Sequence, residues 1–157
     1  MKVFRLSRKK FSKELSGKGA SLSGNRWNSK GTEIIYCASS RALAMAEVAV
    51  HLNLALIPND YLMLEINIPD FISILQIETS KLPLNWDLFP HILSTQKIGD
   101  DFIDDNKYCV LKVPSAVVKG DVNFLINPYH KDFKSIEINN SYSFPFNRRL
   151  FSVVKSK

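Results

Sequence analysis

The chain has few cysteines, and their spacing fits neither a metal site nor a disulfide framework. Its two cysteines, Cys37 and Cys109, do not form the CxxC pair of a zinc site or redox motif. His91 and His130 have no cysteine or histidine near them in the sequence. We therefore expect reduced cysteines in the core, no metal, and surface or structural roles for both histidines.

The chain also lacks a long hydrophobic run. Its most apolar stretch, residues 42–57, is interrupted by Glu47 and His51 and is shorter than the ~20 residues of a membrane-spanning helix. The segment from Met1 to Arg5 contains no apolar signal-peptide core. These absences predict a soluble, cytoplasmic protein with no membrane partner.

The composition is otherwise that of a globular protein. The 157 residues are 45% hydrophobic and 23% charged, so we expect residues 1–157 to form a single domain with a packed core. Lysine and arginine number 21 against 15 acidic residues, which gives a net charge of +6. This charge favours a phosphate-bearing ligand, a nucleic acid or an acidic partner, without choosing among them.

Hydrophobic periodicity predicts an α+β fold, because strands lie at both ends of the chain and helices in the middle. Strands are expected at residues 3–6, 33–38, 61–69, 73–77, 108–118, 122–126 and 135–138. One helix is expected at about 41–54, capped by Ser39 or Ser40 and ended by Pro58. Two short helices broken near Gly99 are expected within residues 83–105.

Four of the six glycines lie within residues 16–31, a polar and basic segment that we expect to be a loop. It is not a P-loop, because Asn25 and Arg26 stand where that motif has Lys followed by Ser or Thr. It is not a dinucleotide fingerprint either, because Leu22 occupies the third glycine position. Arg26 can still grip a phosphate with its planar guanidinium, although a solvated turn with ordinary surface bases remains the alternative.

Glu47 is the second unusual residue, since it sets a carboxylate into a largely apolar helix face. It is exposed by rotation, paired in a structural ion pair, or retained for function. His51 follows it by four residues, but the zinc motif HExxH needs histidine at position 47.

Three other polar residues have ordinary local explanations. Tyr36 lies on a predicted strand, where a lone tyrosine usually belongs to the core or its rim. Ser115 lacks the GxSxG pattern of hydrolases and by itself is a turn serine. Asn123, like Asn127 beyond the next apolar run, is expected in a turn.

Together, however, these residues occur in an order that resembles a known family. Gly24-Asn25-Arg26-Trp27-Asn28, Ile35-Tyr36 and residues 47–52 resemble the N-terminal half of the RES domain, which is named for an Arg, a Glu and a Ser. Residues 111–118, 123–130 and 144–151 resemble its second half, so that the likeness covers essentially the whole chain. Two positions depart from the family pattern: Asn25 replaces a second glycine, and Asn147 replaces an aspartate.

The resemblance implies a toxin of a type II (RES–Xre) toxin–antitoxin system with a fold similar to ADP-ribosyltransferases of the diphtheria-toxin kind. Such a toxin consumes NAD as its substrate, without a metal, by cleaving the nicotinamide–ribose bond through glycohydrolysis or phosphorolysis. Its partner is an antitoxin with an Xre-like helix-turn-helix, which we expect to cover the active site.

The same resemblance assigns the site residues. Arg26, Glu47 and Ser115 take the three name-giving positions, and Tyr36 takes the matching aromatic position. We expect Glu47 to stabilise the positively charged sugar, Arg26 to hold the pyrophosphate and Tyr36 to stack on nicotinamide. Ser115 either binds the ribose or orients Glu47.

Arg5 and Asn123 complete the set of residues that we expect to bind NAD. Arg5 lies on the first predicted strand, matches a family arginine and is expected to share the pyrophosphate with Arg26. Asn123 begins the family-like segment in the second half of the chain.

Two other functions are compatible with the sequence. The first is a mono-ADP-ribosyltransferase that modifies a host protein. The second is a basic nucleic-acid-binding or RNA-cleaving toxin, which the charge and the 17 aromatic residues favour. The basic residues are scattered, however, and no RNP-like or helix-turn-helix pattern is present, so we expect no direct nucleic-acid binding by the toxin alone.

Overall fold

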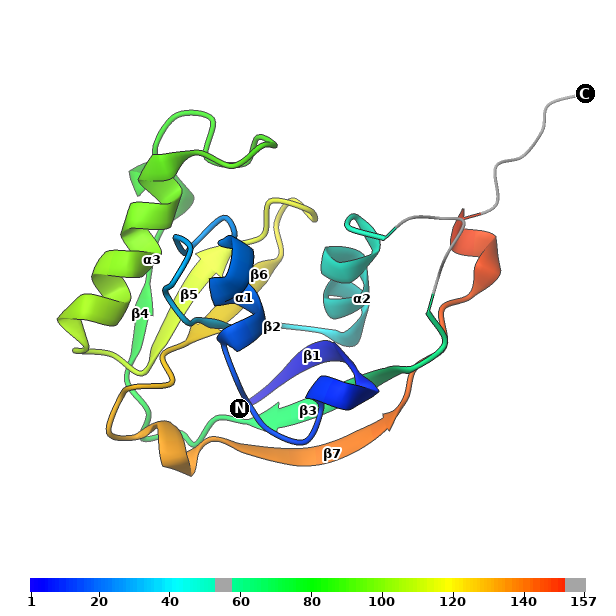
Figure 1. Ribbon diagram of the computed structural model, residues 1–157. Helices are drawn as coiled ribbons and strands as arrows, with labels where there is room; N and C mark the ends of the chain where they lie inside the picture. The colour runs from blue at the N-terminus through cyan, green and yellow to red at the C-terminus, as the bar shows by residue number, and fades with distance from the viewer. Residues whose placement is uncertain (53–57, 152–157) are drawn as a thin grey trace, which may run out of the picture.

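A computed structural model describes residues 1–52 and 58–151. Within them, seven strands form one sheet in the order β4-β5-β6-β2-β1-β3-β7 (Figure 1). The strands are β1 (Lys2–Arg8), β2 (Ile35–Ala38), β3 (Tyr61–Asn67), β4 (Ile74–Gln76), β5 (Val110–Pro114), β6 (Val122–Ile126) and β7 (Glu137–Ser143). The pair β4–β5 is parallel and the other pairs are antiparallel.

Three α-helices and four short 3-10 helices complete the described part of the chain. They are α1 (Lys18–Ser23), α2 (Arg41–Ala49), α3 (Leu93–Asp105), η1 (Lys9–Phe11), η2 (Thr79–Lys81), η3 (Phe133–Ser135) and η4 (Arg148–Phe151). The predicted α+β class is confirmed. None of the helices in the described ranges is both long and apolar enough to cross a membrane.

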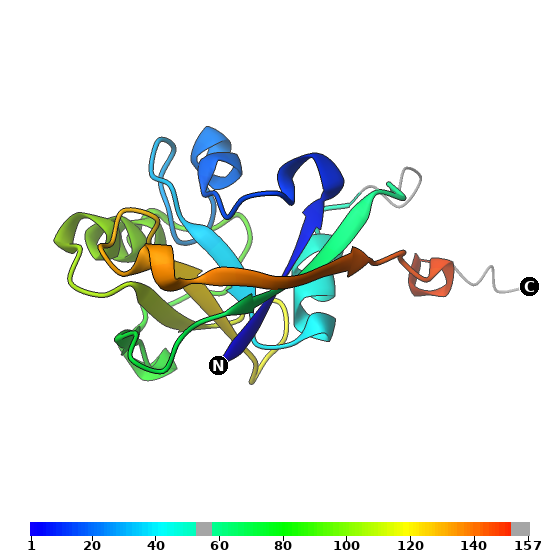
Figure 2. The same ribbon diagram turned by 90° about the horizontal axis from the view of Figure 1, so that it is seen from below.

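The two halves of the sheet join at a narrow contact. Strand β1 is paired with β3 at seven positions but with β2 only at Phe4 and Ala38. Seen from below, β1 and β2 are strongly inclined to each other (Figure 2). Strands that cross in this way diverge beyond their contact.

Several predicted boundaries were wrong. The segment containing residues 16–31 is not all loop, because it includes α1. The helix predicted at 41–54 ends at Ala49, and its last two predicted positions lie outside the described residues. Strand β5 ends at Pro114, and the predicted strand at 135–138 is instead β7, which begins at Glu137. Asn123, expected in a turn, lies within β6.

The two short helices predicted within residues 83–105 are one helix, α3, preceded by an irregular loop. Gly99 lies inside α3 rather than breaking it. A Cβ atom at this position would lie 1.6 Å from the backbone oxygen of Trp27. The glycine therefore allows α3 to press directly against the turn that contains Arg26 and Trp27.

The sheet is covered on both faces near its centre. The alternation predicted for β3 places Leu64 and Ile66 in one core cluster, but Met63 is also buried, in a second cluster. Glu65 is buried as well and is bonded to the guanidinium of Arg41. This pairing explains how a carboxylate can occupy the centre of a buried strand.

Candidate active site

A cavity of about 790 Å³ is lined by residues of both β1 and β2. Its size lies within the range of small-molecule and cofactor sites. In Figure 1 the end of α2, the turn between β5 and β6 and the loop at 83–92 all lie at the upper side of the molecule, and each contributes to the cavity wall. The lining includes Arg5, Arg26, Tyr36, Glu47 and Asn123, five of the six predicted site residues.

Glu47 is carried into the cavity by α2. The side chain of Ser40 accepts a hydrogen bond from the backbone of Leu43 and caps this helix, and Leu43 and Ala44, one turn before Glu47, are buried. Oε1 of Glu47 accepts hydrogen bonds from Ser115 Oγ at 2.7 Å and from Asn123 Nδ2 at 2.6 Å. Both donors engage the same oxygen, so neither occupies Oε2.

Ser115 is the sixth predicted residue, and it lies behind Glu47. Its side chain is buried in the turn after β5, where the amides of Val117 and Val118 donate hydrogen bonds to its hydroxyl at 3.1 and 3.0 Å. A hydroxyl has one proton to donate and two lone pairs to accept with. The two amides fill the lone pairs, so the single proton is directed to Glu47.

Arg26 also lines the cavity, but part of its guanidinium is already bonded within the chain. Its Nη1 donates hydrogen bonds to the carbonyl of Trp86 and, at 2.9 Å, to the carbonyl of Leu88. Burial lowers the pKa of Arg26, and the nearby charge of Glu47 opposes this effect. Part of the guanidinium thus holds the loop at 83–92, leaving the other N–H groups of the fork for a ligand.

The turn that carries Arg26 is fixed from behind. Tyr36 donates a hydrogen bond of 2.7 Å from its hydroxyl to Oδ1 of Asn28 and accepts one from the backbone of Trp27 at 3.2 Å. Nδ2 of Asn28, which is fully buried, donates to the carbonyls of Ala20, Ser29 and Thr32. Burial raises the pKa of Tyr36, so its hydroxyl stays protonated.

Helix α3 adds further support to this turn. Nε2 of Gln96 donates to the carbonyls of Asn25 and Asn28, each at 3.1 Å. The carboxylate of Asp100 accepts a hydrogen bond of 2.9 Å from the backbone of Ser29. The position of Arg26 therefore depends on residues about 70 positions away in the sequence.

Arg5 supplies a second cation to the cavity. Its Nη1 is buried and has no hydrogen-bond partner among the described residues. Burial lowers the pKa of this guanidinium, while the neighbouring Cys37 opposes the shift. A buried arginine nitrogen without a partner is costly, and it fits an anionic group such as a phosphate.

Comparison with known proteins identifies the family. The family model for the RES domain matches residues 2–147. The chain belongs to the RES-domain family. It is 40% identical to a "Prs ADP-ribosylating toxin" of Sphingobium sp. (strain YBL2), over 79% of this chain and 78% of the relative. It is 38% identical to a "Toxin Res" of Photorhabdus laumondii, over 85% of each chain.

The fold is also similar to a solved structure. A chain in the crystal structure of the M. tuberculosis MbcT–MbcA toxin–antitoxin complex matches with a TM-score of 0.74 and covers 96% of this chain and 86% of its own length. The sequence identity is 20%, so this likeness concerns the fold. In the present chain, Glu47 and Ser115 are in direct contact, and Arg26 lines the same cavity as Glu47.

Several lining residues were not found by sequence reasoning. Asp87, Phe89 and His91 come from the loop at 83–92, and His51 comes from the turn that follows α2. His91, expected on the surface or in a structural role, lines the cavity, and its pKa is lowered by burial, then by Arg26 and His51. The sequence of this loop contains no motif that marks it as part of the site. Its place beside the cavity follows from the hydrogen bonds that Arg26 donates to it.

Of the remaining candidates, Cys37 belongs to the cavity lining, whereas His130 and Cys109 do not. His130 is buried in a turn, where its Nδ1 accepts a hydrogen bond from the backbone of Asp132 at 3.2 Å, which is the structural role expected of it. Cys37 and Cys109 are free and buried. Across residues 1–52 and 58–151, no group of three or more His, Cys, Asp or Glu side chains could hold a metal ion.

Proposed function

We propose that this RES-domain protein is a toxin that consumes NAD by cleaving the bond between nicotinamide and ribose. The observation that carries the proposal is the carboxylate of Glu47, held on the cavity wall by Ser115 and Asn123. The same cavity is lined by Arg5, whose Nη1 has no hydrogen-bond partner among the residues that the structure describes. A carboxylate and a cation on one cavity suit a substrate that develops positive charge at a sugar and carries negative phosphates.

In the proposed reaction, the electron pair of the C1′–N bond leaves with nicotinamide and neutralises its ring charge. The ribose becomes an oxocarbenium ion, which the negative charge of Glu47 stabilises more strongly than the ground state. An oxygen of the acceptor then bonds to C1′, and the proton of that acceptor passes to solvent. This electrostatic role requires a carboxylate that keeps its position during the reaction.

Ser115 and Asn123 are positioning residues in this scheme. Both bind Oε1 of Glu47, which leaves Oε2 as the oxygen to face the ribose. Of the two roles expected for Ser115, its geometry favours orienting Glu47 over binding the ribose. Asn123, expected to bind NAD directly, acts through the same carboxylate.

Arg5 and the free N–H groups of Arg26 hold the pyrophosphate, and the ring of Tyr36 forms a wall for nicotinamide. The hydroxyl of Tyr36 points to Asn28 and Trp27 rather than to a ligand, so only the ring face is available. The acceptor is water or phosphate. Transfer to a protein is the second candidate, because one relative is named for ADP-ribosylation.

The decisive test is incubation of the purified protein with NAD, with and without phosphate and with a bacterial protein extract, followed by separation of products. Free ADP-ribose, a phosphorylated ADP-ribose or labelled protein identifies the acceptor. Glu47→Gln keeps the shape of the side chain, and we expect it to lower the rate by at least ~10²–10³-fold. Glu137→Gln, on the exposed edge strand β7, is the matched control and should leave the rate unchanged.

Two results would reject the proposal. If Glu47→Gln keeps more than half of the wild-type rate of NAD cleavage, then Glu47 has a structural and not a catalytic role. Intact NAD together with cleaved RNA would support the nucleic-acid alternative, which a steep salt dependence of RNA affinity would also indicate.

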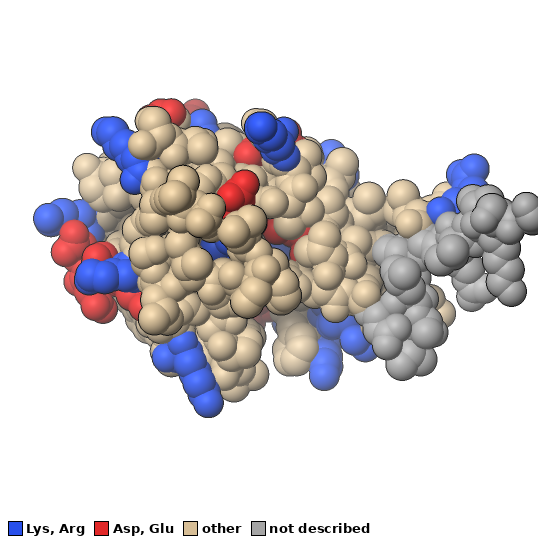
Figure 3. Space-filling view, turned by 90° about the horizontal axis from the view of Figure 1, so that it is seen from above, with Lys and Arg blue, Asp and Glu red and all other residues tan. Residues whose placement is uncertain are grey.

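We further propose an Xre-like antitoxin that covers the mouth of the cavity in the cytoplasm. Exposed apolar residues surround this mouth: Val50, Phe89 and Val117 all line the cavity and are at least 36% exposed. Lys and Arg lie mainly at the edges of this face, whose middle is mostly tan (Figure 3). An apolar centre of this kind suits a protein partner.

In a bacterial host, expression of the toxin alone should stop growth and lower cellular NAD, and co-expression of the antitoxin should restore both. Growth arrest at unchanged NAD would contradict both proposals.

A further inference from the structure

Phe89 combines two properties that rarely occur together. Its side chain is 79% exposed, yet it belongs to the lining of the cavity. Exposing a large aromatic side chain brings no packing benefit within the chain itself. The ring is therefore available to a molecule that enters the cavity.

The backbone beside Phe89 is held in place. Trp86 packs against Trp27, with ring centroids 6.1 Å apart, and joins the core cluster beneath the cavity. Arg26 bonds the carbonyls of Trp86 and Leu88, the residue directly before Phe89. The backbone of Leu88 also donates a hydrogen bond of 3.2 Å to the carbonyl of Asn85. An exposed ring on an anchored backbone is a preformed surface, which lowers the entropic cost of binding.

We propose that Phe89 is a substrate-binding residue that stacks on an aromatic base of the dinucleotide. The inference rests on the proposed function, because NAD offers two flat bases for such a contact. Base–aromatic stacking is favourable for any base, so it suits either ring. Arg26 then has two tasks: it binds phosphate with its free N–H groups and places the stacking surface with Nη1.

The other residues of the cavity do not provide this surface at the mouth. The hydroxyl of Tyr36 is engaged by Asn28 and Trp27, which keeps that ring near the floor formed by β2. Val50 and Val117 are aliphatic and have no ring face to offer. Among the Phe, Tyr and Trp side chains that line the cavity in the described chain, Phe89 is thus the exposed one.

The test compares Phe89→Ala, Phe89→Tyr and Leu84→Ala. Leu84 lies on the same loop and is 88% exposed, but it is not among the residues that line the cavity. Phe89→Ala should raise the KM for NAD about 5- to 100-fold, with kcat changed less than about threefold, because stacking adds uniform binding. Phe89→Tyr keeps an aromatic ring and should have the KM of the wild type. Leu84→Ala should also have the KM and kcat of the wild type.

A binding measurement separates this inference from the proposed function. Calorimetry with NAD compares Glu47→Gln with the double variant Glu47→Gln/Phe89→Ala, so that binding is read without turnover. Weaker NAD binding by the double variant than by Glu47→Gln supports the role of Phe89, whether or not the wild type cleaves NAD. A wild type that binds NAD without cleaving it would refute only the proposed reaction. Absence of NAD binding to Glu47→Gln would overturn both.

Three results overturn the inference alone: an unchanged KM in Phe89→Ala, an equal effect of Leu84→Ala, or failure of tyrosine to restore binding. Comparison with nicotinamide mononucleotide, which lacks adenine, identifies the base. A loss of affinity for both molecules indicates stacking on nicotinamide, and a loss for NAD alone indicates stacking on adenine.

Discussion

The hydroxyl of Ser115 donates a hydrogen bond of 2.7 Å to Oε1 of Glu47, across 68 residues of sequence. The backbone amides of Val117 and Val118 fix this hydroxyl by donating to it in turn. A chain of hydrogen bonds therefore runs from the turn after β5 to the carboxylate on α2. Such a chain sets the position of the charge before any ligand is bound.

Removing this hydroxyl tests the positioning role. We expect Ser115→Ala to lower kcat for NAD cleavage about 10- to 100-fold with little change in KM, because the carboxylate loses one of two hydrogen bonds but keeps its charge. Asn123→Ala should behave similarly. Ser141→Ala, on the exposed strand β7, is the control.

The double variant Ser115→Ala/Asn123→Ala gives the sharper measurement. If both residues act through Glu47, its loss in kcat should differ clearly from the product of the single losses. In a Glu47→Gln background, Ser115→Ala should have almost no further effect. Independent, multiplicative losses, or a rise in KM alone, would instead indicate contact with the substrate.

Arg26→Lys should weaken NAD binding and loosen the loop at 83–92 together. A lysine ammonium cannot reproduce the planar fork that bonds two carbonyls and still faces a ligand. We expect a higher KM for NAD and faster hydrogen exchange in peptides that cover the loop. Arg149→Lys, at an exposed position, is the control. A normal KM with a normally protected loop would place Arg26 outside the proposed binding role.

The two cysteines should be unreactive while the protein is folded. Burial raises the pKa of Cys37 to about 12 and that of Cys109 to about 11. Alkylation requires the thiolate, which is scarce at pH 8, well below both values. Mass spectrometry should find iodoacetamide adducts on both residues in denaturant and almost none in the native protein. Rapid native labelling of Cys37, which lines the cavity, would show that the cavity floor opens to solvent.

The sequence was sufficient where the signal is local or the spacing is specific. Strand β2 and helix α2 follow from clustered β-branched residues and from a serine cap, and the RES-like order of residues located Arg26 and Glu47. The periodicity of β3 predicted one buried face, but β1 and β7 flank the strand and both its faces are covered. Burial on the second face depends on elements elsewhere in the chain.

The rest of the site depends on contacts between distant segments. Gly99 was interpreted as a helix break because glycine has low helix propensity, whereas the backbone of Trp27 leaves no room for any larger residue there. The loop at 83–92 has no motif, so Phe89 could be assigned to the cavity only once the hydrogen bonds from Arg26 to the carbonyls of Trp86 and Leu88 were known.

Gln96 on α3 should influence NAD binding although it does not line the cavity. Its side chain donates hydrogen bonds to the carbonyls of Asn25 and Asn28, on either side of Arg26. Gln96→Met keeps the length of the side chain and removes both bonds, at a cost of about 1–3 kcal/mol in stability. Because the turn is then less firmly held, we expect a severalfold higher KM for NAD with nearly unchanged kcat.

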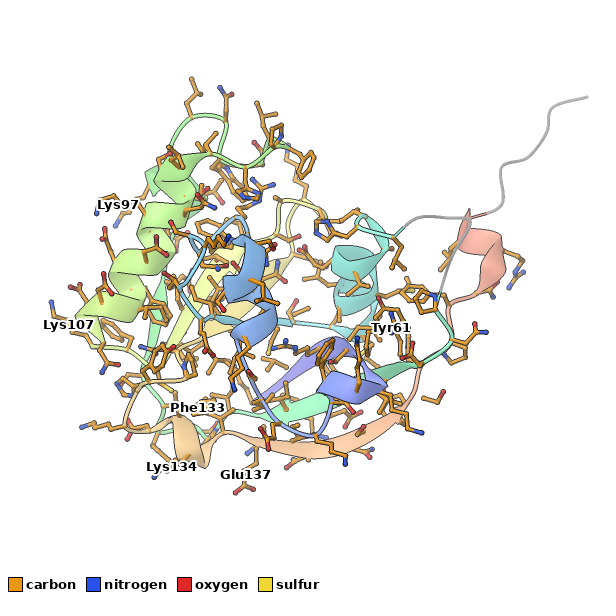
Figure 4. All side chains as sticks on the ribbon, viewed as in Figure 1. Tyr61, Lys97, Lys107, Phe133, Lys134 and Glu137 are labelled. Carbon is orange, nitrogen blue, oxygen red and sulfur yellow. The ribbon has the colours of Figure 1, made fainter. Side chains whose placement is uncertain are left out.

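Lys97→Met provides the matched control for this prediction. Lys97 is the next residue of α3 and points away from the sheet, on the outer side of the molecule (Figure 4), where it forms an exposed ion pair of 2.7 Å with Asp101. Its loss should change neither KM nor kcat, since exposed ion pairs contribute little. The two variants therefore differ mainly in their contact with the turn that carries Arg26.

If Gln96→Met lowers the unfolding temperature but leaves the KM at the value of Lys97→Met, then Gln96 stabilises the fold without positioning Arg26. If the KM rises, combining Gln96→Met with Arg26→Lys should add little to the effect of Arg26→Lys alone, because both changes act through the same guanidinium.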